Sequence, residues 1–199
     1  MGTDIKCNTN RTIEIETRGA EGTLIRTKDL IIRDSVFEDT KQFYEWELLP
    51  EVNKFFSIAD NQSYTDVVRK YIHDDEEPAQ RQYTITLKET GEPIGRIVLG
   101  DIIEGWKAEV WRIYIGDVNL RGKGYGKQAM EAVMKICFEE LNLERLYLDH
   151  YTGNPAAQLY LALGFQYEGV LRKNCRKNGV LYDVHLMSML RDEYFAHLR

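Results

Sequence analysis

The sequence has few cysteines and no long apolar run, and each shortage excludes a class of protein. No stretch approaches the roughly 18 uncharged apolar residues that a membrane span needs. The segment from Met1 to Asn10 is polar, and no apolar run typical of a secretory signal follows it. The three cysteines, Cys7, Cys137 and Cys175, lie far apart and cannot all pair with one another. We therefore expect reduced thiols, a cytoplasmic location and no membrane association.

Excess positive charge and metal-ligand spacing are also missing. The 26 Lys and Arg residues are outnumbered by 32 Asp and Glu, which gives a net charge of −6 and argues against a nucleic-acid partner. The same acidic balance favours a cationic small partner. The four histidines show no ligand spacing, so no metal site is expected.

The chain length suits one domain with a short appendage. The 199 residues, 43% hydrophobic and 29% charged, are ordinary for a globular protein. Residues 1–27 are polar and mixed, with a short alternating segment from Arg11 to Thr17, so we predict an N-terminal extension there. Residues 28–199 are predicted to form the domain.

Alternating and four-residue periodicities along the domain predict a mixture of strands and helices. We expect strands at 30–32, 83–87, 94–103, 108–115, 146–148, 165–172 and 180–190 and helices at 38–49, 64–73, 126–141 and from 154 to 164. Pro50 is expected to stop the first helix, and Asn178-Gly179 is the turn signal of a C-terminal hairpin. The sum is an α/β (α+β) domain with a central mixed sheet flanked by helices.

The most informative segment is Arg121-Gly122-Lys123-Gly124-Tyr125-Gly126, between a predicted strand and the strongest predicted helix. Backbone amides at a helix start are unsatisfied and carry partial positive charge, so they suit an anion such as a phosphate. Glycines let the backbone turn sharply and approach the anion closely. Arg121, Lys123 and Lys127 add full charges.

Neither of two common phosphate-binding motifs matches this segment. A P-loop would need a glycine five residues before Gly126-Lys127 and Ser or Thr after it, but Arg121 and Gln128 stand there. A dinucleotide-binding fingerprint needs different glycine spacing. A tight turn with solvated lysines would produce the same residues, so the segment alone indicates only an anion site.

Two motifs in a fixed order make the segment specific. Arg121, Gly124 and Gly126 follow Ile113-Tyr114-Ile115, and some 30 residues later comes Leu159-Tyr-Leu-Ala-Leu-Gly-Phe165. Over roughly residues 28–195 this pattern resembles the GNAT acetyltransferase superfamily. The closing hairpin further resembles the branch that acetylates ribosomal-protein N-termini, polyamines and related amines.

The resemblance implies a splayed sheet and an acetyl-coenzyme A site. In such enzymes the glycine-loop amides hold the pyrophosphate, which implies Gly122, Lys123, Gly124, Tyr125 and Gly126, with Arg121 and Lys127 close by. The preceding strand pairs with the pantetheine arm and supplies an oxyanion-stabilising amide, which places Ile113, Tyr114 and Ile115 beside the co-substrate.

Tyr160 matches the family tyrosine that protonates the departing thiolate; a packed core tyrosine is the alternative. Family members usually carry an asparagine seven residues before that tyrosine, where this sequence has Gly153. Asn154, six before it, could contact the pantetheine or serve only as a helix cap.

A base must also remove a proton from the attacking ammonium, because only the neutral amine is a nucleophile. Glu109 is the first candidate, since several family members carry a glutamate on that strand. A surface ion pair is the alternative role for Glu109. Asp101, Glu45 and Glu47 could substitute for it, or the amine could arrive neutral.

The acceptor site is expected in the variable parts of the family, here Phe43–Asp75 and Arg172–Tyr182. An acidic run at 74–77 could attract a polyamine, although such a run is more typical of a solvated loop. Cys137, on the apolar stripe of a helix, is expected to be packed rather than nucleophilic. Four aromatic residues are candidates for the acceptor pocket or for the core: Trp46, Phe55, Phe56 and Trp106.

The leading hypothesis is therefore an N-acetyltransferase that moves an acetyl group from acetyl-coenzyme A directly to a primary amine through a tetrahedral intermediate. The acceptor would be a small molecule or a protein N-terminus, and a homodimer is compatible with the resemblance. The competing hypothesis is a non-catalytic sensor that binds an acyl-coenzyme A. A purely structural domain is the third.

Overall fold

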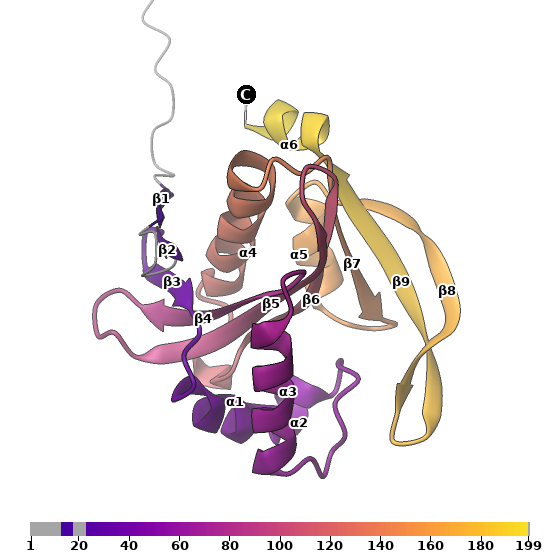
Figure 1. The fold of residues 1–199 in the computed structure, drawn as a ribbon. Helices are drawn as coiled ribbons and strands as arrows, with labels where there is room; N and C mark the ends of the chain where they lie inside the picture. The colour runs from indigo at the N-terminus through magenta and orange to yellow at the C-terminus, as the bar shows by residue number, and fades with distance from the viewer. Residues whose placement is uncertain (1–12, 18–22, 199) are drawn as a thin grey trace, which may run out of the picture.

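In the computed structural model, residues 13–17 and 23–198 are described. Cys7 and Arg11 lie outside them. Nine strands in these residues form one sheet in the order β1-β2-β3-β4-β5-β6-β7-β9-β8 (Figure 1). The strands are β1 (Glu14–Thr17), β2 (Thr23–Arg26), β3 (Leu30–Asp34), β4 (Arg81–Leu87), β5 (Pro93–Ile103), β6 (Lys107–Ile115), β7 (Arg145–Tyr151), β8 (Gln166–Lys177) and β9 (Val180–Leu190).

The sheet is mixed because one pair of neighbours, β6 and β7, runs parallel, while every other pair is antiparallel. The parallel pair follows from the chain passing through a helix between these two strands. The prediction of a mixed sheet that ends in a hairpin is confirmed, since β8 and β9 pair around Asn178-Gly179.

The helices are α1 (Asp39–Glu47), α2 (Pro50–Asn53), α3 (Tyr64–Glu76), α4 (Tyr125–Lys135), α5 (Ala156–Ala162) and α6 (Arg191–His197). A π-helical turn, Ile136–Glu140, continues α4. Figure 1 shows α1, α2 and α3 grouped at one end of the molecule and α4 packed along the sheet. Within the described ranges, no helix is both long and apolar enough to cross a membrane.

Two local predictions on the helices hold only in part. The first helix ends before Pro50 as expected, but Pro50 also begins α2, because proline's fixed φ and missing amide suit the first helical position. In the acidic run at 74–77, residues 75–77 are exposed as expected, but the run is helical up to Glu76 rather than a loop. Asp74 lies in the last turn of α3, only 2% exposed, and accepts a hydrogen bond from Lys70 at 3.0 Å.

Two apolar clusters hold the helices against the sheet. The larger cluster joins α4, α5 and α6 to the strands through residues such as Met130, Val133 and Phe138, which are almost fully buried. A smaller one joins α1, α2 and α3 to Tyr114 of β6. Strand β6 therefore contributes to both clusters, and its two faces are covered along part of its length.

The parallel join between β6 and β7 is short. Only three Cα pairs connect them, from Lys107–Arg145 to Glu109–Tyr147. On its other side β6 pairs Val110 with Leu99 and Arg112 with Val98, so Trp111 is an extra residue in β6. Such a bulge bends its strand and increases the local twist. The two strands consequently separate beyond Glu109 and Tyr147, which agrees with the expected splayed sheet.

The predicted N-terminal extension, 1–27, contains β1 and β2, which lengthen the sheet at its edge. Ile25 of β2 is fully buried in the larger cluster. These strands therefore pack as part of the same sheet, and the predicted boundary at residue 28 stays a prediction.

Candidate active site

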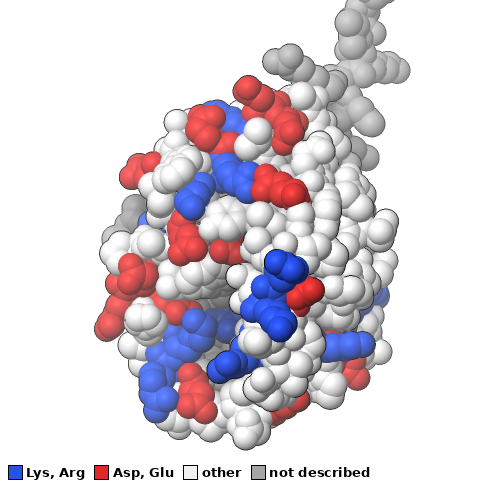
Figure 2. All heavy atoms as spheres, turned by 90° about the vertical axis from the view of Figure 1, so that its right-hand side faces the viewer, with Lys and Arg blue, Asp and Glu red and all other residues white. Residues whose placement is uncertain are grey.

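A cavity of about 660 Å³ opens where β6 and β7 separate. Its walls come from the α2 region, α3, β6, the glycine loop, α4, β7, α5 and β8. Figure 2 shows a hollow on the face that carries the β8–β9 hairpin, with Lys and Arg side chains on two sides of it. Segments distant in the chain thus converge on one site.

The glycine loop lies at one end of this cavity. Gly122 and Gly124 have φ values of +76° and +85°, a left-handed conformation that favours glycine, and Gly124 is the residue that caps α4. No heavy atom lies within 4 Å of where a Cβ would stand on either residue. The loop is therefore open toward solvent and free to approach an anion at the helix start.

The loop residues divide into two groups. Arg121, Gly122, Tyr125 and Gly126 line the cavity, whereas Lys123, Gly124 and Lys127 are exposed and do not line it. Arg121 donates hydrogen bonds to the carbonyls of Ile115 and Glu51, each at 3.2 Å from Nη2. Arg121 thus ties the loop to the end of β6 and to α2.

The strand residues predicted to lie beside the co-substrate all line the cavity: Ile113, Tyr114 and Ile115. The Tyr114 hydroxyl donates to Glu47 Oε1 at 3.1 Å, and burial raises the pKa of that hydroxyl. Tyr114 is therefore neutral, and its hydroxyl is hydrogen-bonded to a residue of α1.

Glu47 is the centre of a buried charge network. Its carboxylate is 1% exposed and accepts hydrogen bonds from Arg96 at 2.9 Å, Arg112 at 3.2 Å and Gln62 at 3.0 Å. Burial alone would raise the pKa of Glu47, but the charges of Arg112 and Arg96 hold it below its ordinary value. Glu47 is thus a structural carboxylate rather than a free base, and Glu45 is exposed outside the cavity.

Tyr160 lines the cavity from α5 and is 7% exposed. Burial raises the pKa of its hydroxyl to about 12. In the part of the chain that the structure describes, no residue forms a hydrogen bond with this hydroxyl. A neutral, unpaired hydroxyl in a cavity can donate its proton to a bound group.

Asn154 also lines the cavity. Its Oδ1 accepts a hydrogen bond from the amide of Ala156 at 3.0 Å. This bond supports the start of α5, but the residue directly before the helix is Pro155, one position later than the predicted cap. The side-chain nitrogen is still available to a ligand, so contact with a co-substrate stays a prediction.

Glu109, the first candidate for the base, does not line the cavity. Its carboxylate accepts a hydrogen bond from Trp111 Nε1 at 3.1 Å. Burial, followed by the nearby charge of Asp149, raises the pKa of Glu109 above its ordinary value. Asp101 is exposed and accepts from the Tyr147 hydroxyl at 3.4 Å. The role of Glu109 stays a prediction.

Sequence reasoning missed two residues of the cavity wall on β7, Asp149 and Tyr151. Ser57, Lys70 and Cys175 also line the cavity; they lie within the ranges expected for the acceptor site but were not singled out. One signal could have found Asp149: in the alternating segment Leu146–Tyr151 it shares a face with Tyr147 and Tyr151. The expected strand at 146–148 stopped one residue too early to include it.

The four aromatic candidates for the acceptor pocket lie in different parts of the structure. Phe55 and Phe56 line the cavity, Trp46 packs in the smaller apolar cluster, and Trp106 is 55% exposed.

Cys137 is fully buried, and burial raises the pKa of its thiol, so it is packed as predicted and is not a nucleophile. Among residues 13–17 and 23–198, no cluster of three or more His, Cys, Asp or Glu suits a metal ion.

Comparison with known proteins agrees with this geometry. The family described as "Acetyltransferase (GNAT) domain" matches residues 29–166. The N-acetyltransferase p20 of Bacillus licheniformis is 32% identical over 176 residues, which cover 84% of this chain and 96% of that protein.

Two solved structures share the fold. Spermidine N-acetyltransferase from Vibrio cholerae, in complex with CoA and spermine, superimposes with a TM-score of 0.74 at 25% identity, over 84% of this chain and 98% of that one. An acetyltransferase from Salmonella typhimurium that modifies the N-terminal serine of ribosomal protein L7/L12 gives 0.71 at 15% identity, over 82% and 95% of the two chains, which speaks for the fold alone. The chain belongs to the GNAT acetyltransferase family and is an N-acetyltransferase.

Proposed function

We propose that this N-acetyltransferase takes its acetyl group from acetyl-coenzyme A and transfers it to a primary amine without a covalent enzyme intermediate. The observation that carries the proposal is the single cavity that runs from the glycine loop, between the separated strands, to the Tyr160 hydroxyl. A long co-substrate with a phosphate at one end and a thioester at the other fits this arrangement.

The residues present suit coenzyme A. Gly122 and Gly126 would bring their backbone amides to the pyrophosphate, aided by the α4 N-terminus and the exposed charges of Lys123 and Lys127. Along β6, Ile113 to Ile115 would pair with the pantetheine arm, because β7 has already turned away from them. The thioester would then lie toward the inner end of the cavity.

The chemistry at the thioester needs a donor to the oxyanion and an acid for the sulfur. We assign the first to a backbone amide of β6, which is fixed in place before reaction. We assign the second to Tyr160, because its pKa of about 12 keeps the hydroxyl protonated at neutral pH. With Cys137 sealed in the core, attack by the amine itself on the thioester is the simplest route.

The acceptor is proposed to be a primary amine on a small molecule or a protein N-terminus. Relatives of similar fold include enzymes named for both classes, a spermidine acetyltransferase and one that modifies L7/L12. The thiols of Cys137 and Cys175 are free, which supports a cytoplasmic location that cell fractionation would test.

The test is release of free thiol from acetyl-coenzyme A with polyamines, amino-terminal peptides and other amines. Amine-dependent thiol release, with the acetylated product identified by mass spectrometry, is the expected result. Tight coenzyme A binding without transfer to any amine would instead support the sensor hypothesis. Absence of binding would contradict both.

Replacing Tyr160 with Phe tests the assigned acid. The ring packing against Phe165 is kept while the proton is lost, so kcat should fall by roughly 100-fold, with little change in the affinity for coenzyme A. Steady-state kinetics and calorimetric binding would separate the two effects. An unchanged kcat would remove Tyr160 from this role.

A further inference from the structure

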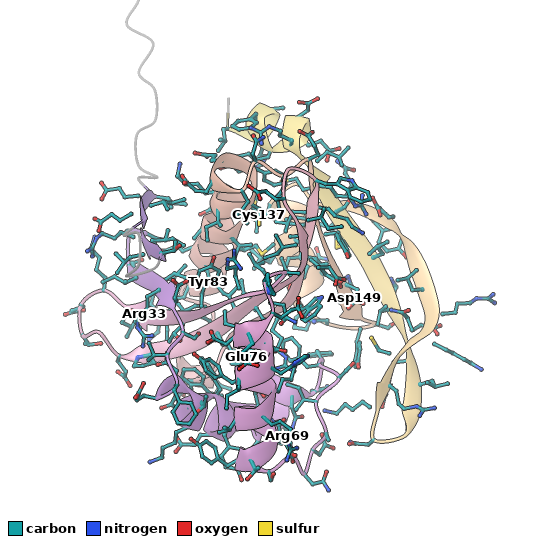
Figure 3. All side chains as sticks on the ribbon, viewed as in Figure 1. Arg33, Arg69, Glu76, Tyr83, Cys137 and Asp149 are labelled. Atoms are coloured by element: carbon teal, nitrogen blue, oxygen red, sulfur yellow. The ribbon has the colours of Figure 1, made fainter. Side chains whose placement is uncertain are left out.

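Asp149 lies where the sheet opens. The last β6–β7 pair is Glu109–Tyr147, so Asp149 stands two residues further along β7, on the same face of the strand as Tyr147. Figure 3 shows it between α3 and the β8–β9 hairpin, and its side chain lines the cavity together with Lys70 of α3 and Cys175 of β8.

The Asp149 carboxylate has no hydrogen-bond donor among the residues that the structure describes. Asp149 is half-buried, and carboxylates that are partly withdrawn from water are usually paired, because leaving one without a partner is costly. Asp149 therefore offers both oxygens to whatever enters the cavity.

The charged groups around Asp149 do not neutralise it. Lys70 and Arg112 line the same cavity, but Lys70 pairs with Asp74 at 2.9 Å and Arg112 with Glu47 at 3.2 Å. The other titratable groups that interact with it are Glu109 on β6, His150 and Tyr151 on β7, and Cys175 on β8. The His150 ring contacts the Tyr151 carbonyl, at 3.1 Å from Nδ1, and forms no hydrogen bond with the Asp149 carboxylate.

Glu109 is in a different situation. Its carboxylate accepts a hydrogen bond from Trp111 Nε1. Glu109 does not line the cavity, and it is the last residue of β6 that pairs with β7. The Trp111 ring is in turn fixed over Gly100, where a Cβ would come within 2.2 Å of the ring. Glu109 therefore orients the Trp111 side of the cavity, whereas Asp149 faces the space where an acceptor would lie.

We infer that Asp149 binds the ammonium group of the acceptor and removes its proton, with Glu109 in a positioning role. This inference rests on the proposed function, since it names the residue that prepares the amine for attack. It also specifies the acceptor at the reacting end: a primary ammonium with at least one N–H directed at the Asp149 carboxylate.

One ammonium proton moves to Asp149, the nitrogen lone pair forms a C–N bond with the thioester carbonyl, and the C–S bond breaks. The sulfur takes its proton from Tyr160, and the second proton lost by the nitrogen restores Tyr160. The proton on Asp149 leaves to solvent after the products depart.

The experiment compares Asp149→Asn with Glu109→Gln, using an amine that the wild-type enzyme acetylates. We expect Asp149→Asn to lower kcat/KM by roughly 100-fold or more at pH 7 and to leave the affinity for coenzyme A unchanged. Glu109→Gln should cause a smaller loss. Asp192→Asn, in the exposed first turn of α6, is the control and should behave as wild type.

The pH profile separates a base from a structural role. Wild-type kcat/KM should fall on the acidic side as Asp149 becomes protonated, and Asp149→Asn should lose that limb. Its deficit should shrink as the pH approaches the pKa of the amine, because the amine then arrives neutral. A structural defect would give the same deficit at every pH.

Two outcomes would overturn the assignment. One is wild-type kinetics in Asp149→Asn, whether or not Glu109→Gln loses activity; the other is a deficit in kcat/KM of Asp149→Asn that does not depend on pH. Circular dichroism checks folding, and Asp149→Ser replaces the variant if Asp149→Asn does not fold. If the wild-type enzyme acetylates no amine, the proposed function fails first, so the two failures are distinguishable.

Discussion

At the residue scale, Glu47 illustrates a buried charge that serves structure. Two arginines, a tyrosine and a glutamine converge on one carboxylate that is 1% exposed. The Glu47→Gln variant would leave Arg96 buried without its counter-charge, so we expect a loss of about 3–5 kcal/mol in the free energy of unfolding. Urea denaturation measures it.

The matched control is Glu45→Gln, on the exposed side of the same helix. Its free energy of unfolding should change by less than about 0.5 kcal/mol. Equal effects of the two substitutions would contradict the view that Glu47 holds the network together.

Asp149 illustrates the opposite case, a carboxylate whose ionised form lowers the free energy of unfolding. Burial raises its pKa from the ordinary value of 3.8, so the folded protein binds this proton more tightly than the unfolded chain does. The stability that it contributes is full below that value and is lost as the pH rises through the raised pKa.

Asp149→Asn should therefore raise the melting temperature at pH 7, and the advantage should disappear below about pH 4. Thermal unfolding of variant and wild type across this range is the measurement. A variant that is less stable than wild type at pH 7 would mean that the carboxylate has a stabilising partner.

At the element scale, the glycine loop shows how backbone conformation prepares a site. Gly122→Ala places a side chain at φ +76°, which costs roughly 1–2 kcal/mol in stability, and also points a methyl group into the expected phosphate position. We expect the Kd for coenzyme A to rise about tenfold, equal to roughly 1.4 kcal/mol. Calorimetry measures this affinity.

Gly91→Ala is a close control, because Gly91 has φ +72°, equally open surroundings and a place in the β4–β5 turn outside the cavity wall. It should lose similar stability and keep its affinity for coenzyme A. If both variants bind coenzyme A like wild type, the loop does not hold the pyrophosphate.

The elements that could be predicted from the sequence are those with local signals. Alternation located β4, an extended apolar segment located β5, the four-residue period located α4, and Gly164 marked the end of α5. Only half of the role of Pro50 was predicted, because the same residue can follow the end of one helix and begin the next. The burial of Asp74 depends on packing of α3, which composition does not reveal.

The residues of the cavity also differ in whether a local sequence signal marks them. The loop at Gly122–Gly126 and Tyr160 carry short motifs, so the sequence singled them out; Gly122, Gly126 and Tyr160 line the cavity, and their roles stay predictions. Asp149 was not singled out because its place in the cavity wall depends on where β6 and β7 part. That point is set by an extra residue at Trp111 in β6 and by the pairing of distant strands. The alternation of Leu146–Tyr151 places Asp149 on one face of a strand, but it does not show where the two strands part.

At the scale of the whole molecule, occupation of the cavity should stabilise the fold, because the ligand joins walls that come from many elements. Coenzyme A at 100 times its Kd should add about 2.7 kcal/mol to the free energy of unfolding. A thermal-shift titration measures this, and pantetheine, which lacks the phosphates, should give a smaller shift at equal concentration.

Salt should weaken the effect of coenzyme A more than that of pantetheine, because Lys123 and Lys127 are exposed and screening shortens their reach from about 10 Å at 0.1 M to about 3 Å at 1 M. An equal salt effect on both ligands would contradict a contribution of these charges.

The order of strands in the sheet also bears on how the molecule is made. From β1 to β6 each strand lies beside its predecessor, so this half can assemble from pairings made as the chain emerges during synthesis. The three-pair join to β7 must wait until α4 has been added, and β9 must then enter between β7 and β8. The wall of the cavity is therefore complete only when the last strands dock, so we expect that a nascent chain acetylates nothing before its synthesis is nearly complete.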